Sequence, residues 1–463
     1  MAAIITSKFR IHNAQSFKEG FGESAASNMY LGIGRPQAWA NDNSPDTPRD
    51  TVSDEYYYWD DMLALKRIQT SDVAHAIPRR DWTSGKYYDI YRHDYNGTTT
   101  GVNIDSGGST TPASLYDANF FVITDEYNVY KCLDNRGSAN TVVASTTKPT
   151  GNSTTPITTA DGYVWKYMYT ISPADVIKFV STDFIPVKTI TSNPGSTDAY
   201  YDQWLVAAAA VDGSIENVLV TNGGTGYTSA PTVTITGDGT GATATATIDL
   251  GSGTVRSINI TNVGSGYTYA NIGISGGGGA SAAGTAIITP KGGHGTDPVE
   301  ELGGYYVMMN VRLEYADGAG DFPVDNDYRR ITLIRDPYNF GTTTVSTAST
   351  LKATRELTVS SVSGTFAQDE TITGGTSGAV GRITSVSGST IRYILLRTDN
   401  STGEVIEAAE SITGGTSGAT ATVATLVNPE VEPDSGDVIY VENRRPINRA
   451  IDQIEDIKII VEM

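Results

Sequence analysis

The last residues of the chain form an apolar, β-branched run that has to be buried. Residues 457–461 read Ile-Lys-Ile-Ile-Val and stop two residues before the C-terminus. They predict a strand inside a sheet. Residues 3–9 contain a second short apolar segment, and we expect these two strands to lie side by side. The sequence therefore predicts a domain closed by both termini, in which the middle of the chain is free to accept insertions.

Helices and strands are also predicted between the termini. Residues 56–68 place apolar side chains near helical spacing and give the clearest helix signal in the sequence. Residues 13–20 read as a shorter helix with Asn13 as its N-cap. Strands are predicted at residues 29–34, 118–124, 128–133 and 163–171, and the second and third of these form a hairpin.

The strand at residues 163–171 carries an aromatic side chain at every second position. Such alternation places all of these rings on one face of a sheet. We interpret them as sheet core and cross-strand pairs. The rings belong to Tyr163, Trp165, Tyr167 and Tyr169.

The segment that follows Pro78 combines two guanidinium groups, an acid and a large ring. It reads Arg79-Arg80-Asp81-Trp82. One interpretation, which we favour, is an internal clamp made of Arg–Asp and Arg–aromatic contacts. The other is an exposed contact site for a partner subunit, because Arg and Trp are enriched in such sites.

Two regions of the chain each contain a duplicated β-rich segment. Residues 220–228 recur as residues 260–268, and residues 370–379 recur as residues 410–419, each pair forty positions apart. Their small side chains bury little area, so we expect each copy to need its duplicate to complete a core. The sequence therefore predicts two inserted β-modules, at residues 205–290 and 352–428.

Charge and composition limit the classes of partner. The chain has 463 residues, a net charge of −20, and no apolar run long enough to span a bilayer. This charge argues against nucleic-acid binding and against anionic membranes, and it favours other proteins as partners. The N-terminus lacks a signal-peptide pattern, so we expect synthesis in the cytoplasm of the host.

We find no sequence pattern that predicts catalysis, a metal or a cofactor. The single cysteine, Cys132, excludes an intrachain disulfide, and the four histidines lack metal-ligand spacing. The glycines form neither a dinucleotide-binding fingerprint nor a phosphate-binding loop with its lysine. The acidic pairs at residues 60–61 and 300–301 are interpreted as solvated charge. The sequence predicts a protein that is not an enzyme.

Six strings of the sequence together resemble one known family. They are Ile-Thr-Ser-Lys-Phe-Arg at residues 5–10, Ala-Ile-Pro-Arg-Arg-Asp-Trp at 76–82, Val-Tyr-Lys-Cys-Leu-Asp at 129–134, Asp-Gly-Tyr-Val-Trp-Lys-Tyr at 161–167, Arg-Ile-Thr-Leu-Ile-Arg-Asp-Pro at 330–337 and Tyr-Val-Glu-Asn-Arg-Arg-Pro-Ile at 440–447. They resemble the baseplate wedge subunit encoded by gene eight of bacteriophage T4 and its relatives. Six collinear strings are more specific than any single short motif.

The resemblance implies a dimeric structural component of a contractile-tail baseplate, located in the virion and in contact with other wedge proteins. It also implies a layered β-sandwich frame with helix-bearing loops, here at residues 1–204, 291–351 and 429–463 around the two inserted modules. The structural or partner-contact candidates are Arg79, Arg80, Asp81, Trp82, Trp165, Arg444 and Arg445. An alternative function is a carbohydrate-binding or host-receptor-binding module that uses the Gly/Thr-rich inserts.

Overall fold

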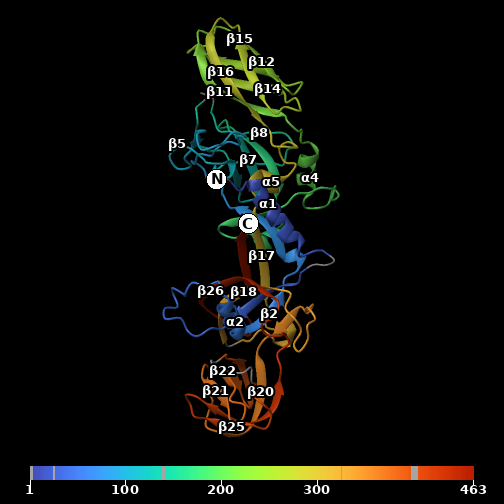
Figure 1. The fold of residues 1–463 in the computed structure, drawn as a ribbon. Helices are drawn as coiled ribbons and strands as arrows, with labels where there is room; N and C mark the ends of the chain where they lie inside the picture. Colours follow the sequence, from blue (N-terminus) through green and yellow to red (C-terminus); the bar gives the residue numbers. More distant parts are fainter. Residues whose placement is uncertain (1–3, 24–26, 138–140, 325, 398–404) are drawn as a thin grey trace. The chain divides into compact units, whose positions relative to one another are not determined.

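The computed structural model describes residues 4–23, 27–137, 141–324, 326–397 and 405–463. The chain is mainly β, as the sequence predicts, and Figure 1 shows its strands and helices. It divides into two compact units. Unit 1 comprises Met1–Ser16, Ala74–Met308 and Ile460–Met463, and unit 2 comprises Phe17–Val73 and Met309–Ile459. Each unit is described separately.

A four-stranded antiparallel sheet forms the centre of the largest hydrophobic cluster of unit 1. Two of its strands make the predicted hairpin, in which Phe121 pairs with Lys131 and Ile123 pairs with Val129. Trp165 is fully buried, and its ring stacks on that of Tyr163 with the centroids 5.4 Å apart. In order across the sheet, the strands are β6 (Phe121–Ile123), β7 (Asn128–Asp134), β9 (Val164–Thr170) and β8 (Ile157–Thr158).

Short elements surround this sheet. Helix α5 (Pro298–Leu302) begins where the Asp297 side chain accepts a hydrogen bond from the Glu300 N–H at 3.1 Å, and it ends at Gly303 in the left-handed conformation. The other short elements are α3 (Pro173–Phe179), α4 (Tyr201–Ala208), the 3-10 helix η2 (Leu115–Asp117), β4 (Gly101–Val102) and β5 (Ser109–Thr110).

The first duplicated region of the sequence forms a six-stranded sheet in unit 1. Tyr227 and Tyr267, which occupy the same place in the two repeats, are both buried. A Cβ on Gly279 would clash with the Tyr227 ring, and one on Gly239 would clash with the Tyr267 ring. Each tyrosine therefore packs against a glycine that follows the other copy. In spatial order the strands are β15 (Ala270–Ser275), β12 (Thr232–Gly237), β13 (Thr243–Asp249), β14 (Thr254–Asn262), β11 (Ile215–Thr225) and β16 (Ala280–Ile288).

Unit 2 contains a five-stranded sheet. Its predicted strand at residues 29–34 is confirmed as β1 (Met29–Gly34), and it lies between two antiparallel partners. All six residues of β1 are buried. In spatial order the strands are β19 (Thr350–Lys352), β2 (Met62–Arg67), β1, β18 (Asn326–Arg335) and β26 (Asp437–Arg449). The short helices of unit 2 are α2 (Val52–Asp60), η1 (Thr70–Asp72) and η3 (Asp317–Ala319).

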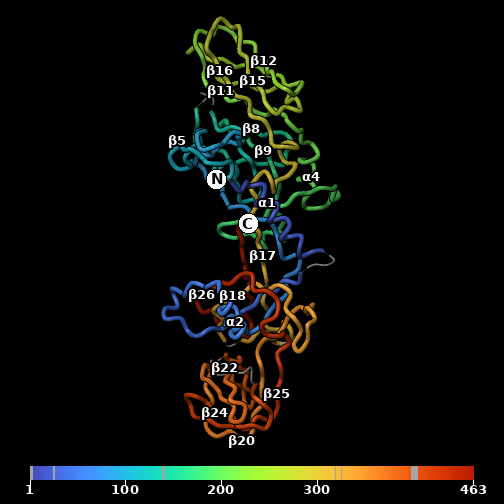
Figure 2. The backbone as a smooth tube through the Cα atoms, in the orientation of Figure 1, coloured from blue at the N-terminus to red at the C-terminus, as the bar shows by residue number. Residues whose placement is uncertain are grey.

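The second duplicated region forms a closed barrel in unit 2, and Figure 2 traces its backbone in the orange to red part of the chain. The two repeats meet where β21 pairs with β24, with Ile372 opposite Gly414 and Gly374 opposite Ile412. The apolar side chains inside form one cluster. Around the barrel the strands are β20 (Arg355–Ser363), β23 (Thr390–Leu395), β22 (Val380–Ser387), β21 (Thr371–Gly374), β24 (Ser411–Gly414) and β25 (Thr420–Val427).

The C-terminal strand forms as predicted, but the prediction of an N-terminal strand beside it is wrong. The last strand, β27 (Glu455–Glu462), buries Ile457 and Ile459 and belongs to a sheet of order β10-β3-β17-β27. The predicted N-terminal strand is absent among the residues described there, because the chain enters helix α1 (Ser7–Glu19) instead. The remaining strands of the sheet are β3 (Val73–Pro78), β10 (Phe184–Val187) and β17 (Tyr306–Leu313).

Two predicted helices differ from the structure. The helix expected at residues 13–20 begins six residues earlier, so Asn13 lies inside α1 and is not its N-cap. The helix expected at residues 56–68 is half helix and half strand, since α2 ends at Asp60 and β2 starts at Met62. Burial between β1 and β19 overrides the helix propensity of Met, Leu and Ala in β2.

Candidate partner-contact site

The Arg80 guanidinium is enclosed by the loop that precedes β6. Its Nη1 donates to the Ala118 carbonyl oxygen, and its Nη2 donates to the Tyr116 carbonyl oxygen at 3.0 Å. The guanidinium carbon lies 4.6 Å from the centroid of the Phe121 ring. Burial lowers the pKa of Arg80 to about 10, so the group stays charged at neutral pH and its charge is offset by carbonyl dipoles and the ring.

Arg79, Asp81 and Trp82 also have partners within unit 1. The Arg79 Nε donates to the Asp81 carboxylate at 3.0 Å, and its Nη1 donates to the Ser181 carbonyl oxygen at 3.0 Å. The Trp82 indole N–H donates to the Ser145 hydroxyl at 3.0 Å. Asp81 is exposed, whereas Arg79 and Trp82 are half-buried. The motif therefore presents one exposed acid beside side chains that are held by internal contacts.

The other sequence candidates lie in different surroundings. Trp165 is part of the core of unit 1, and its indole nitrogen has no hydrogen-bond partner among the described residues. Arg444 lies on β26 in unit 2, where its Nε donates to Glu442 at 2.7 Å and its carbonyl oxygen accepts from the Trp39 indole at 2.8 Å. Arg445, the next residue, is exposed.

A buried ion pair in unit 1 was missed by the sequence reasoning. Lys131 on β7 donates to the Glu301 carboxylate from α5, and the side chains are 0% and 2% exposed. Glu301 also accepts from the Gly295 N–H at 2.7 Å. Burial alone would raise the pKa of Glu301, but Lys131 and the adjacent His294 lower it to about 2. The interpretation of residues 300–301 as solvated charge is therefore wrong for Glu301.

His294 completes this cluster in its neutral form. Burial, together with the Lys131 charge, lowers the pKa of His294 to about 4. Its ring packs edge-on against Tyr91 with the centroids 4.7 Å apart. A signal in the sequence could have pointed to this cluster, because Lys131 interrupts an apolar strand and a lysine buried there needs a counter-charge.

The second acidic pair is also structural. In unit 2 Asp61 accepts from Arg330 at 2.8 Å and from Arg382 at 3.0 Å, and the Arg330 guanidinium lies over the Tyr58 ring. Arg382 belongs to β22 of the barrel, whereas Arg330 belongs to β18 of the five-stranded sheet. Solvated charge is therefore the wrong interpretation of Asp61, which connects the barrel to the sheet.

These contacts are those of a structural framework. They consist of guanidinium–carbonyl, guanidinium–carboxylate and cation–ring interactions between residues of the same unit. Within the described ranges, no group of three or more His, Cys, Asp and Glu side chains is arranged to hold a metal ion. None of the helices described here combines the length and apolar character that crossing a bilayer requires.

Comparison with known proteins places the chain in a family. A family model described as Bacteriophage T4, Gp8 matches residues 3–222 and 405–463, which is more than half of the chain. The chain belongs to this Gp8 family. A curated relative, the baseplate wedge protein gp8 of Enterobacteria phage T4, is 28% identical over 212 residues. That alignment covers 40% of this chain and 60% of the relative.

The two segments matched by the Gp8 model contain every residue proposed from the sequence as a structural or partner-contact candidate. They include the loop after β3, Trp165 on β9, and both arginines on β26. Residues 223–404 lie outside the matched segments, and they hold most of the six-stranded sheet of unit 1 and most of the barrel. The string at residues 330–337 also lies outside, although it contributed to the resemblance.

Proposed function

We propose that this protein is a structural subunit of a baseplate wedge in a contractile phage tail, where it joins neighbouring wedge proteins and catalyses no reaction. The observation that carries the proposal is the Gp8 match at both ends of the chain, at residues 3–222 and 405–463. The T4 relative is itself a baseplate wedge protein. Buried ion pairs that fix elements within each unit suit a protein whose task is to hold a shape.

The proposal includes a homodimer formed through the predicted frame at residues 1–204, 291–351 and 429–463, and contacts with other baseplate wedge proteins. The net charge of −20 supports protein partners over nucleic acid or an anionic membrane. The protein would be made in the host cytoplasm and would end in the virion, at the tail baseplate. Within the clamp interpretation, Arg79, Arg80, Asp81 and Trp82 serve to position their loop.

The decisive experiment is to purify phage tails and determine where this protein lies. Mass spectrometry of the tails should detect the protein at a fixed multiple of six copies per tail, and a density map should place it in the wedge. Light scattering of the isolated protein should give the mass of a dimer. Tails that contain no copy of the protein would refute the proposal.

The isolated protein also allows a test of the alternative function, in which the protein binds a carbohydrate or a host receptor. The first inserted sheet exposes alternate threonines of β12 and β13, which offer hydroxyl groups on one face. If this face binds a host glycan, the isolated protein should bind host cells without the rest of the tail. A subunit that only joins wedge proteins should not bind them.

A further inference from the structure

A pocket in unit 1 lies where the six-stranded sheet meets the four-stranded sheet at the centre of the unit. It has a volume of about 340 Å³, which is at the small end of the range for ligand pockets. The two sheets are connected there by Asn217 on β11, whose amide group donates to the Leu133 carbonyl oxygen of β7. The charged and amide side chains that line the pocket belong to Asp134, Arg136, Glu216, Asn217, Arg256 and Asn259.

Glu216 and Arg256 occupy equivalent positions in the two copies of the first repeat. They are separated by forty positions, as the repeated segments are. Each of them is an extra residue in its strand, because the residues on either side of it pair with two adjacent residues of the neighbouring strand. A β-bulge of this kind changes the direction of the side chain, and here both bulged residues line the pocket.

The acids at the pocket already have partners. Glu216 lies 4.0 Å from the Lys166 ammonium group, and its second oxygen, Oε2, is buried and does not face the opening. The Asp134 carboxylate accepts from the Arg136 Nε at 3.1 Å. These two pairs leave no net charge on the side of the pocket formed by β7 and β11.

Arg256 is the charge at the pocket that remains without a partner. Within the described ranges its side chain forms no hydrogen bond and no ion pair, and the residue is half-buried. The Nε is buried, whereas Nη1 and Nη2 remain accessible. Asp249 on β13 attracts Arg256 electrostatically, but its carboxylate accepts from the Gly251 N–H at 2.9 Å. An anion that reached the guanidinium group would therefore gain charge-assisted hydrogen bonds that the chain itself does not supply.

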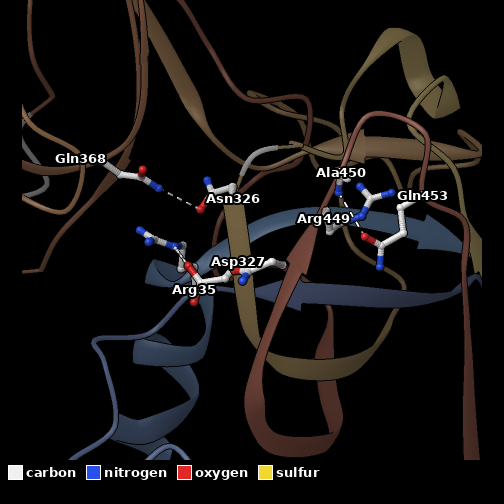
Figure 3. A pocket seen from close by; sticks show the side chains of 8 residues that line it. Arg35, Asn326, Asp327, Gln368, Arg449, Ala450 and Gln453 are labelled. Atoms are coloured by element: carbon white, nitrogen blue, oxygen red, sulfur yellow. Dashed lines mark hydrogen bonds and ion pairs between the residues drawn. The ribbon is translucent and has the colours of Figure 1, made fainter.

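The larger pocket of unit 2 offers no such group (Figure 3). There the Arg35 Nε donates to Asp327 at 2.7 Å. Arg449 donates from its Nε to Glu455 at 2.7 Å, and its terminal nitrogens and the second oxygen of Glu455 are all buried. Both arginines that line this pocket are thus paired with a carboxylate, in contrast to Arg256.

The lining of the pocket in unit 1 indicates the class of anion. A single unpaired guanidinium group favours a single negative charge, because a second one would face Asp134 and Glu216 without a counter-charge. The planar fork of a guanidinium group matches the two oxygens of a carboxylate. Apolar side chains beside it favour a ligand with a compact apolar body. They belong to Val164, Val218, Ile258, Ile260 and Val263.

We propose that this pocket binds a small organic acid, whose carboxylate accepts hydrogen bonds from the Arg256 guanidinium group and whose apolar body packs on the apolar lining. Because residues of both sheets line the pocket, the bound acid would also stabilise the junction between them. This binding is a property of the isolated chain and does not depend on assembly into a tail.

Titration of the full-length protein with 4-bromobenzoate at constant ionic strength tests the proposal. The neutral amide 4-bromobenzamide has nearly the same shape and should bind about tenfold more weakly, because it presents one oxygen and no charge. Inorganic phosphate should not displace the acid. In co-crystals the bromine gives an anomalous signal, and the carboxylate should lie within hydrogen-bond distance of the Arg256 terminal nitrogens.

Variants at Arg256 separate binding from folding. Arg256→Gln removes the charge and should weaken 4-bromobenzoate binding by about tenfold. Since Arg256 has no partner in the described part of the chain, circular dichroism of this variant should be unchanged. Arg256→Lys keeps the charge without the parallel donors, so its affinity should lie between the two. Arg49→Gln is the matched control, because the Arg49 side chain is 79% exposed and does not line the pocket.

Several results would overturn the proposal. They are the absence of 4-bromobenzoate binding up to its solubility limit, equal affinity for the amide and the acid, and displacement of the acid by phosphate. Equal affinity of Arg256→Gln and Arg49→Gln would have the same meaning. So would a bromine signal that lies only away from Arg256.

Discussion

Glu370 and Glu410 each bind the turn that belongs to the other's repeat. The Glu370 carboxylate accepts hydrogen bonds from the Ser417 N–H at 2.8 Å and hydroxyl at 2.8 Å, and Glu410 accepts from the Ser377 N–H at 3.0 Å and hydroxyl at 2.9 Å. A Cβ on Gly374 or Gly414 would lie 2.7 or 2.8 Å from the opposite carboxylate oxygen. The absence of a side chain at Gly374 and Gly414 therefore leaves space for each carboxylate to reach the turn of the other repeat.

Because Glu370 and Glu410 each accept hydrogen bonds from the other repeat, we expect the barrel to unfold in acid. Burial raises the pKa of each carboxyl group, but hydrogen bonds from the opposite turn and from the backbone N–H three residues before it lower the pKa below the ordinary value of 4.5. Their contribution to stability is thus complete above about pH 4.5 and is lost as the pH falls through the lowered pKa. Glu370→Gln or Glu410→Gln should reduce the free energy of unfolding by about 2–4 kcal/mol at neutral pH and flatten its pH dependence.

Urea unfolding of the full chain between pH 3 and pH 7 measures this effect. Glu407→Gln is the matched control, because Glu407 is exposed and its side chain does not bind a turn. If the two buried variants keep the acid transition of the unmodified protein, the carboxylates do not hold the barrel together.

Arg80→Ala should lower the unfolding temperature. Removing the guanidinium leaves the Tyr116 and Ala118 carbonyl oxygens without their donor and uncovers the Phe121 ring, which should cost about 2–3 kcal/mol. Arg79→Ala removes a half-exposed pair with Asp81 and should cost less than about 1 kcal/mol. Differential scanning calorimetry distinguishes the two variants. Unchanged stability of Arg80→Ala together with failed tail assembly would instead identify a partner-contact site.

A deletion can remove the distal part of the six-stranded sheet in unit 1. Val220 pairs with Gly284 across β11 and β16, while Leu219 and Ile287 belong to the main core of unit 1. Removal of residues 221–283, with a short turn joining Val220 to Gly284, should leave a soluble dimer by light scattering. The wider deletion of residues 205–289 also removes core side chains and should give insoluble protein. A monomeric product of the narrow deletion would place the dimer contact in the sheet.

The C-terminal strand should tolerate only a very short truncation. Ile457 and Ile459 are 2% and 1% exposed, and each contributes roughly 1.5–3 kcal/mol by its burial. Ending the chain after Asp456 should therefore give unfolded or insoluble protein. Ending it after Val461 loses the surface ion pair of Glu462 with Arg10, and solubility and circular dichroism should be nearly unchanged. A folded product that ends at Asp456 would contradict this prediction.

Local pattern predicted the strands and repeats better than it predicted the partners of charged side chains. Alternating rings identified β9, and the duplicated strings identified both β-rich regions, because these patterns can be read directly from the order of the residues. By contrast, Lys131 and Glu301 are separated by 170 positions and meet only when α5 packs against the central sheet.

The segment from Tyr56 to Arg67 shows that a helical spacing of apolar residues does not by itself determine secondary structure. The spacing of its apolar residues favours a helix, yet the helix stops at Asp60 and the next residue binds Arg330 and Arg382. Met62 and Leu65 then enter a buried strand between two others. Long-range contacts determine where the helix ends and the strand begins, so local sequence patterns could not predict this boundary.

The division of the chain into units has a consequence for its synthesis. The chain passes from one unit to the other after Ser16, Val73, Met308 and Ile459. Each unit therefore contains segments that are made before and after segments of the other unit, and the strand β27 contributes residues to both. Neither unit can fold to completion on a nascent chain while the other is still unmade. A chain that ends before β27 therefore lacks strand residues of both units, so a premature stop codon there leaves neither unit complete.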